Sequence, residues 1–583
     1  MTPTPAARLL ARLLGALLSE GLLTAKPLDG PATAWRLDLA GASYTFQATT
    51  SVFDVIDVEP GSVVRAGPGV LGDEEAGAAT DPEQLVADAA ADLDLPGSTV
   101  AGFIAELAAT LAADHRLLGS AAPAKDVVTL PHAEIEGHLV GHPLLVANKG
   151  RLGFSASDCA AYAPEARRPV RPVWLAVSRR LAEFRSVPSM SEDDLLSGEL
   201  AAETRARFVS QIRQREAAPE GYLLMPAHPW QVDHVVHQLW SQAVLLDQLI
   251  VLGEADDDYR PTQSIRTLVN VSRPERHQVK LPLKILNTSV YRGIPRHCAL
   301  AAPMTTHWLR GIWDADPVLR ESAVLLGEVA SVTVHHPQLS GLPGVPYQWD
   351  ETLGCIWREP VEPALGEGET VWPLALLTHQ GPAEDLAVSA LADRAACSVS
   401  SWLERLVPVV LAPLLHLIHT YGITVNPHGE NLMVICDPTG MPGRLVVKDL
   451  VDDVCVTSEE VPERGWEPDG RDRVLPRKPW HVLRQYLVDA LFLGVWGPLG
   501  RLLDEHVPDA SSADLWRWTR GVVEGYATSH PGQAERLEAT GLLGAEFTRY
   551  PLNGYRLRTG YTDLDTRPPV PPAGTMPNPM FRG

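Results

Sequence analysis

An apolar helix followed directly by a short β-hairpin is the feature of this chain that most restricts its fold. Residues 401–420 form a mostly apolar stretch of helical length that runs into Gly422. Two apolar runs follow, at residues 432–435 and 445–447, and a turn-forming segment rich in proline and glycine separates them. The pattern predicts a helix, a polar loop and two antiparallel strands.

Polar side chains lie at the open end of this predicted hairpin. Asn431 begins the first strand and Asp449 follows the second, so strand pairing brings their side-chain oxygens to one end of the ladder. A site with only two protein oxygen ligands suits Mg²⁺, because this ion can take its other ligands from nucleotide phosphates. A polar hairpin end without a metal is the alternative for an isolated Asn/Asp pair. The pair Asp452-Asp453 fits either a solvated strand end or a second set of ligands.

The charge balance excludes several classes of partner. The 583 residues include 49 basic and 72 acidic ones, a net charge of −23, which argues against a general nucleic-acid or anionic-membrane surface. Any anion site must therefore be a local pocket. Six scattered cysteines without a CxxC pair indicate a reducing compartment, and the leucine-rich N-terminus indicates an amphipathic helix rather than a signal peptide. We expect a cytoplasmic protein with no nucleic-acid or membrane partner.

The order of the predicted elements indicates an α+β chain of three regions. Residues 1–136 combine an N-terminal helix, short strands (one of them at 52–58) and further helices. Residues 137–335 mix short strands with loops, and residues 336–583 are rich in helices apart from the hairpin. No alternation of strands and helices points to a parallel sheet.

A basic segment stands out in this acidic protein. Residues 264–296 contain seven cations and a single acid, Glu275. Residues 279–288 alternate as a strand would, which predicts that Lys280, Lys284 and Thr288 face the same way and can bind phosphate oxygens. The cations that this segment carries are Arg266, Arg273, Arg276, Lys280, Lys284, Arg292 and Arg296, of which Arg266 and Arg292 can add forked contacts to a phosphate or carboxylate. A solvated charged face explains the pattern equally well.

The sequence lacks the common nucleotide-binding and hydrolase motifs, such as a P-loop, a Rossmann glycine pattern or a nucleophile elbow. Its helix–His428–Asn431–Asp449 order is typical of the metal-binding half of a protein-kinase-like site. Such kinases place a catalytic aspartate five residues before the asparagine, where this chain has Asn426, which cannot accept a proton. We therefore expect an ionised carboxylate to attack the α-phosphate, which forms an acyl-adenylate and releases pyrophosphate. A kinase-like small-molecule phosphotransferase and a non-catalytic nucleotide-binding scaffold remain the alternatives.

A set of motifs resembles the aerobactin-synthetase (IucA/IucC) family of NRPS-independent siderophore synthetases. In chain order the matching segments are Gly141-His142-Pro143 with Lys149-x-Arg151-x-Gly153-Phe154, Pro226-Ala227-His228-Pro229-Trp230-Gln231, Ser264-Ile265-Arg266-Thr267, Lys280-Leu281-Pro282-Leu283, Thr288-Ser289-x-x-Arg292, His428-Gly429-x-Asn431 and Lys448-Asp449. The resemblance implies ATP-dependent condensation of a carboxylic acid, typically citrate, with an amine or alcohol. It also implies a hand-like fold of thumb, fingers and palm, which would correspond to the three regions above, and often a homodimer.

The same resemblance implies roles for individual residues. Lys280, Arg292 and His428 would be catalytic, with His428 stabilising charge that develops on the α-phosphate. Asn431 and Asp449 would hold Mg²⁺. The triphosphate would contact Ser264, Arg266, Lys280, Thr288, Arg292, His428 and Asn431. The carboxylate substrate would contact Arg292, His142 and Arg556. Two departures concern this acid-binding side, because Leu145-Val146 and Asn553 stand where relatives commonly have His-Pro and a lysine.

Overall fold

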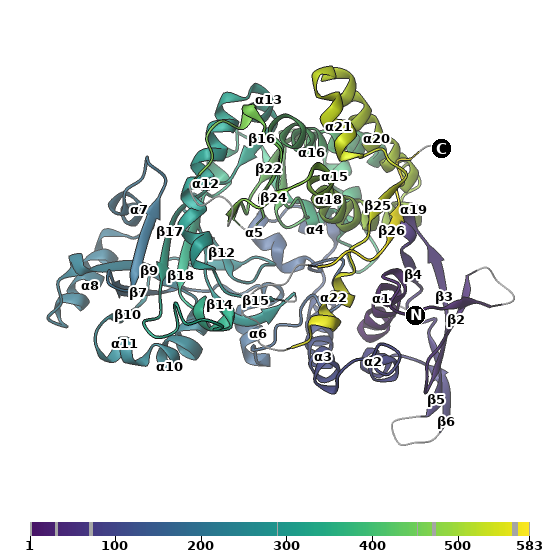
Figure 1. Cartoon of the computed structure of the whole chain (residues 1–583), viewed down its shortest axis with the longest axis horizontal. Coiled ribbons are helices and arrows are strands. Elements are labelled where there is room, and N and C mark those ends of the chain that lie inside the picture. The colour runs from purple at the N-terminus through teal and green to yellow at the C-terminus, as the bar shows by residue number, and fades with distance from the viewer. Residues whose placement is uncertain are drawn as a thin grey trace.

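The computed structural model describes residues 3–28, 33–68, 74–288, 290–451, 453–468, 474–561 and 570–581. Three groups of elements follow one another along the long axis (Figure 1). The N-terminal elements lie at one end, strands and helices from the blue-to-teal part of the chain lie at the other, and the helix-rich C-terminal part lies between and above them. The predicted mixture of helices and largely antiparallel sheets is confirmed.

The N-terminal lobe packs one amphipathic helix against a small sheet. Helix α1 places Leu9, Leu13 and Leu17 in a core with Tyr44 and Phe103. The predicted strand at 52–58 is wrong in its first half, because Phe53 and Asp54 adopt positive φ angles of 63° and 56° and form a helical turn. The elements of this lobe are α1 Pro5–Ser19, β1 Lys26–Pro27, β2 Ala34–Asp38, β3 Ser43–Thr50, β4 Ile56–Val58, β5 Val64–Pro68, β6 Glu74–Ala78, α2 Pro82–Ala89 and α3 Gly97–Gly119.

The second lobe contains two antiparallel sheets over a shared apolar core. One has the strand order β10-β7-β9 and the other β11-β12-β13-β18-β17-β8. The strands are β7 Val173–Ser178, β8 Ala182–Ser186, β9 Tyr222–Ala227, β10 Leu249–Glu254, β11 Tyr259–Pro261, β12 Thr267–Asn270, β13 Gln278–Lys280, β17 Glu328–Val334 and β18 Gly354–Arg358. Helices α6 Ala156–Tyr162, α7 Glu192–Glu199, α8 Ala202–Arg213, α9 Pro229–Gln231, α10 His237–Leu239 and α11 Ser241–Leu245 surround them.

The single strand predicted for residues 279–288 is wrong. Strand β13 ends at Lys280, and a separate strand, β14 (Leu283–Asn287), pairs with β15 (Val290–Arg292) in a two-stranded sheet of its own. Pro282 lies at the break, since a proline has no N–H for a ladder hydrogen bond. Lys280 and Lys284 consequently belong to different sheets.

The third lobe has the largest core, built around helix α16 (Val399–Tyr421). Its four-stranded sheet has the order β16-β22-β21-β19. The other elements include α12 Arg296–Ala315, α13 Pro317–Ser322, β16 Ala323–Leu325, α14 Tyr347–Asp350, β19 Thr370–Pro373, α15 Ala387–Arg394, β20 Ile423–Thr424, β21 Leu432–Cys436, β22 Pro442–Val447, β23 Cys455–Thr457, β24 Arg477–Lys478, α18 Trp480–Leu487, η9 Val488–Trp496, α19 Gly497–His506, α20 Ser512–Ser529, α21 Ala534–Thr540, β25 Glu546–Thr548, α22 Leu552–Thr559 and β26 Thr575–Pro577.

The chain does not enter the three cores strictly in sequence order. The short helices α4 (Ala124–Val127) and α5 (His132–Ile135) and the inner face of α12 pack into the third core, far from its other residues in sequence. Conversely, Leu557 of α22 returns to the core of the N-terminal lobe. These crossings tie the lobes together.

Two helical stretches, Val399–Tyr421 and Trp480–His506, are long and apolar enough to cross a membrane by length and composition. Two thirds of each (67%) is buried inside the protein, where both contribute to the third core.

Gly422 should be required where it ends α16. Its φ of 61° is left-handed, and an added Cβ would lie 2.5 Å from Cγ2 of Thr457. We expect Gly422→Ala to lower the melting temperature by more than Gly21→Ala, which has a similar φ of 70° but nothing within 4 Å of its Cβ position. Gly21→Ala should lose only the stability that a left-handed φ costs a residue with a Cβ, about 1–2 kcal/mol. Equal shifts in thermal unfolding would show that the Thr457 contact does not matter.

Candidate active site

The hairpin predicted from the sequence forms with the expected polar end. Leu432 of β21 pairs with Val447 of β22, and the backbone N–H of Lys448 donates to the carbonyl of Asn431 over 3.1 Å. Gly429 allows the preceding loop to approach the backbone of Ala375, because an added Cβ would lie 2.9 Å from its Cα. Asn431, Lys448 and Asp449 therefore leave the same end of one rigid ladder.

Asp449 links this hairpin to the six-stranded sheet of the second lobe. Its Oδ1 accepts hydrogen bonds from Lys280 Nζ at 2.5 Å and Arg358 Nη2 at 3.0 Å. Arg358 also pairs with the fully buried Glu328 at 3.0 Å. Burial alone would raise the pKa of Asp449, but the charges of Lys280 and Arg358 outweigh it and hold the pKa far below its usual range. Asp449 is therefore an anion at every working pH.

A strained turn brings Arg266 into the same neighbourhood. Ile265 has a φ of 64°, unusual for a β-branched residue, and its fully buried side chain anchors the turn in the core. Ser264 and Arg266 on either side are half-buried, and Arg266 donates from Nη1 to the carbonyl of Gly293. The guanidinium of Arg266 is one of the charges that lower the pKa of Asp449. The turn thus contributes a further cation to the group.

Two histidines meet next to Arg292. The rings of His142 and His428 are 6.4 Å apart between centroids. Burial, the other histidine and Arg292 lower the pKa of His142 to about 3, and burial lowers that of His428 to about 4, helped by Lys448 and Arg292 against Asp449. Nδ1 of His142 accepts from the N–H of Leu144, and Nδ1 of His428 from that of Glu430. Both rings are therefore neutral near pH 7, with the proton on Nε2 as a donor.

Lys448 adds an ammonium group that the described residues leave without an ion-pair partner within 4 Å. It is 6% exposed, and burial lowers its pKa while Glu136, Asp449 and Glu430 oppose the shift. The pKa of Glu430 rises to about 7, chiefly through burial and Glu136. Lys448 is thus surrounded by acidic side chains in a buried region, where charges interact more strongly than in water.

The oxygens required for a metal are available at the hairpin end. The amide nitrogen of Asn431 donates to the carbonyl of Asn426 at 3.2 Å and to Asp453 at 3.4 Å, which turns Oδ1 the other way. In the described part of the chain, neither Asn431 Oδ1 nor Asp449 Oδ2 accepts a hydrogen bond. No group of three or more His, Cys, Asp or Glu that could hold a metal occurs among the described residues. One or two carboxylates with phosphate oxygens are the usual Mg²⁺ set, so the donors fit.

Some predicted site residues lie elsewhere or contact other groups. Arg556 is buried and donates from Nε to Glu106 at 3.0 Å, with its guanidinium 3.7 Å from the Tyr561 ring centroid. Lys284 lies over the ring of Trp349, so the expected row of Lys280, Lys284 and Thr288 is not formed. Thr288 is half-buried in a turn with a φ of 50°, and Ser289 lies outside the described residues.

Comparisons with known proteins agree with this arrangement. A model of the IucA / IucC family matches residues 131–379, and a model of the ferric iron reductase FhuF-like transporter matches residues 400–565. The rhizobactin siderophore biosynthesis protein RhbF of Rhizobium meliloti (strain 1021) is 35% identical over 581 residues, which cover 98% of this chain and 94% of RhbF. The chain belongs to the IucA/IucC family.

The chain is accordingly a siderophore synthetase, an enzyme of the carboxylate–amine ligase class. The structure of aerobactin synthetase IucC from a hypervirulent pathotype of Klebsiella pneumoniae matches with a TM-score of 0.84 at 26% identity, over 98% of this chain and 97% of IucC. The ATP-bound structure of IucA from the same source shares the fold, with a TM-score of 0.76 at 18% identity over the full length of both chains. D-ornithine–citrate ligase of Staphylococcus aureus (strain NCTC 8325 / PS 47) is 24% identical over 330 residues, which cover 53% of this chain and 48% of that protein.

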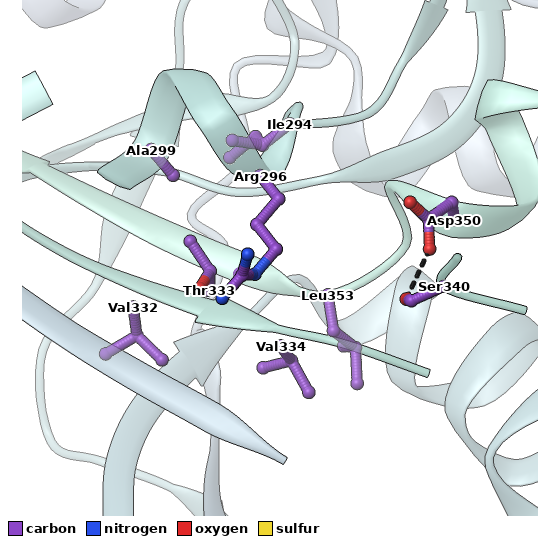
Figure 2. Close-up of a pocket in the computed structure, with 10 residues that line it drawn as sticks. Ile294, Arg296, Ala299, Val332, Thr333, Val334, Ser340, Asp350 and Leu353 are labelled. Carbon is purple, nitrogen blue, oxygen red and sulfur yellow. Dashed lines mark hydrogen bonds between the residues drawn. The ribbon is translucent and has the colours of Figure 1, made fainter. Parts of the chain in front are cut away.

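A surface pocket of the synthetase lies just beyond Arg292, at the start of α12 (Figure 2). Arg296 reaches into it above Thr333, and Ser340 Oγ donates to Asp350 across it at 2.5 Å. None of the residues assigned above to phosphate, metal or carboxylate binding lines this pocket. The candidate site where β13 meets the hairpin therefore does not include this pocket.

Sequence reasoning missed several members of the site. Arg358 and Glu328 lie far from every motif and Glu136 lies outside the motifs, and strand pairing and packing bring them to Asp449 and Lys448. Asp453, left open between a solvated end and a ligand, is half-buried and accepts from Asn426 Nδ2 at 3.0 Å. Its neighbour Asp452 lies outside the described residues. The motif Lys448-Asp449 was the one signal that could have identified Lys448.

The two neutral histidines should make folding sensitive to acid. Their folded pKa values, about 3 and about 4, lie below the unfolded value near 6.5, so the unfolded chain binds more protons between these limits. Stability should therefore fall as pH falls from 7 to 5. We expect His142→Gln and His428→Gln to lose less melting temperature over this interval than the wild type. The exposed His237→Gln is the control and should follow the wild type, and an unchanged acid response in both site variants would contradict the assignment.

Proposed function

We propose that the synthetase uses ATP to adenylate a carboxylate of citrate, or of a related polycarboxylate, and condenses it with an amine or alcohol. The observation that carries the proposal is the meeting of Lys280 with Asp449, beside Arg292 and the paired histidines. It supports a local anion site in a protein of net charge −23. The ATP-bound IucA and the citrate ligase named above support the nucleotide and the acid.

The cations of the cluster would bind the triphosphate. Lys280, Arg266, Arg292 and Lys448 surround the hairpin end, and Ser264 adds a hydroxyl next to Arg266. Asn431 Oδ1 and Asp449 Oδ2 would hold Mg²⁺, which supplies neutralisation of phosphate charge. Thr288 remains a predicted nucleotide contact.

The histidines would act as neutral donors. Each keeps its proton on Nε2, so His428 can donate to an α-phosphate oxygen and His142 to the incoming carboxylate, with Arg292 between them. Donors fixed before the reaction stabilise charge that develops in the transition state without reorganising. Arg556 is committed to Glu106, so we leave it out of the proposed acid-binding site.

The chemistry then needs no base for its first step. A carboxylate oxygen attacks the α-phosphorus, the bond to the bridging oxygen breaks, and pyrophosphate leaves. Asn426, which cannot take a proton, donates to Asp453 instead. Amine attack on the acyl carbonyl then releases AMP.

We further propose that the three lobes correspond to a thumb, fingers and palm, with approximate limits at 1–136, 137–335 and 336–583. The hairpin in the palm resembles the metal-binding element of kinases because it offers Asn431 and Asp449 from one ladder end. We propose a cytoplasmic homodimer as the working form, without nucleic-acid or membrane partners.

The products distinguish adenylation from phosphorylation. With ATP, Mg²⁺, citrate and a primary amine, we expect citrate-dependent formation of AMP and pyrophosphate in equal amounts, measured by coupled phosphate release and nucleotide chromatography. ADP as the product would instead support a kinase-like phosphotransferase, and the absence of citrate-dependent turnover would remove citrate as the acid.

Single substitutions test the proposed site. Because each removes a charge that would act on the reacting phosphate, we expect Arg292→Ala and Asp449→Asn to lower citrate-dependent pyrophosphate release by about 100-fold or more. Arg273→Ala, an exposed cation of the same basic segment, and Asp437→Asn, at the other end of the hairpin, are the matched controls. Retention of full activity by either site variant, with an unchanged melting temperature, would refute its role.

A further inference from the structure

A carboxyl group that the nucleotide site does not use lies in the π-helical segment η9. Asp489 is half-buried, and its Oδ1 accepts from Gln485 Nε2 at 2.7 Å. Gln485 also donates to the carbonyl of Thr548 at 2.8 Å, which fixes its amide. Within the described ranges, Oδ2 of Asp489 accepts no hydrogen bond. π-Helical segments occur frequently at functional sites, since they cost hydrogen-bond geometry.

Asp489 belongs to a polar cluster that continues from the metal end of the hairpin. Asp453, which accepts from Asn431, acts electrostatically on Tyr486, whose hydroxyl accepts from Cys455 Sγ at 3.1 Å. Tyr486 in turn interacts with Tyr550, and Tyr550 with Asp489. Polar groups that act on one another electrostatically therefore extend from Asn431 toward Asp489.

The same segment also touches the loop that carries His142. A Cβ added at Gly494 of η9 would lie 3.3 Å from the carbonyl of Asp489 and 4.0 Å from Cγ of Pro143. Asp489 thus lies on an element packed against the loop of His142, on the proposed acid-binding side.

The surroundings leave the carboxyl able to exchange a proton. Burial raises the pKa of Asp489 to about 7, against the hydrogen bond from Gln485 and the charge of Arg484. Two titratable groups act electrostatically on Asp489. They are Arg484, on the preceding helix α18, and Tyr550, which follows β25. The guanidinium of Arg484 is held by the carbonyl of Gly541 and the ring of Phe547, and the described residues show no ion pair between Arg484 and Asp489. A carboxylate whose pKa lies near 7 is suited to act as a base near neutral pH.

We propose that Asp489 binds the ammonium group of the amine co-substrate and accepts its proton before attack. The inference rests on the proposed adenylation and assigns the second half of that reaction. Asp489 takes one proton from R–NH₃⁺, and the free amine forms the C–N bond to the acyl carbonyl. Collapse of the tetrahedral intermediate breaks the bond to the phosphate oxygen, releases AMP, and passes the second nitrogen proton to the leaving phosphate or water.

The two half-reactions allow a clean test. In the full-length protein we expect Asp489→Asn to keep citrate-dependent exchange of labelled pyrophosphate into ATP within about threefold, while amide formation falls about 100-fold or more. The amine is whichever of ethylenediamine, 1,3-diaminopropane, putrescine and cadaverine reacts fastest with the wild type. Asparagine still accepts the hydrogen bond from Gln485, so a purely structural role would survive. Asp504→Asn, on the next helix, is the matched control.

A second nucleophile and the pH profile separate base catalysis from other defects. Hydroxylamine is largely unprotonated at neutral pH, so Asp489→Asn should form the hydroxamate at close to the wild-type rate. The deficit with the alkyl amine should shrink as pH rises toward the pKa of that amine. Wild-type amide formation in Asp489→Asn, an equal loss with hydroxylamine, or a loss of pyrophosphate exchange would each overturn the assignment. Absence of exchange in the wild type would instead refute the proposed adenylation itself.

Discussion

The carboxylate of Asp449 holds two lobes of the synthetase in one arrangement. It extends from the end of the β21–β22 hairpin and is paired with Lys280 and Arg358, both on the sheet of the second lobe. Taking such charges out of water costs several kcal/mol per ion and is offset only by good geometry, so removing one partner is far more harmful than the pair is stabilising. Asp449 also has a left-handed φ of 66°. Such a buried ion pair on a strained residue would be retained if it fixes the hairpin end relative to the sheet of the second lobe, so that both can bind one ligand.

The proposed site would bind an anion in a protein of net charge −23. Cations are concentrated by strand pairing rather than by overall charge, and the acids among them, Glu328, Glu136 and Asp449, limit their mutual repulsion. The histidines contribute donors without adding charge, because burial and neighbouring cations keep them neutral. In the proposed site, these cations and neutral donors would let a carboxylate approach a triphosphate although the two anions repel each other.

The proposed acceptor side has a different character. Around Asp489 the neighbours are phenols, an amide and one arginine that is engaged elsewhere, whereas the nucleotide side is crowded with cations. A cationic amine would be attracted to the surface around Asp489 and repelled from the nucleotide side. Asn431 at the hairpin end donates to Asp453, which acts electrostatically on Tyr486 of the acceptor side.

Local patterns in the sequence predicted several elements of the fold. The helix–hairpin unit, the end of α16 at Gly422, the N-terminal amphipathic helix and the family motifs could all be predicted, since hydrophobic period, turn residues and spacing are local properties. Prediction from the sequence failed where a local pattern was overridden: alternation predicted one strand through Lys280 and Lys284, but Pro282 interrupts the ladder and sends the two lysines to different sheets. Two further results depend on tertiary contacts: Arg358 and Lys448 lie at the candidate site, and Arg556 pairs with Glu106 rather than being available to a carboxylate substrate. Those contacts join residues that are distant in sequence, and the free energy that selects them comes from packing and charge pairing in the folded core, which no single segment encodes.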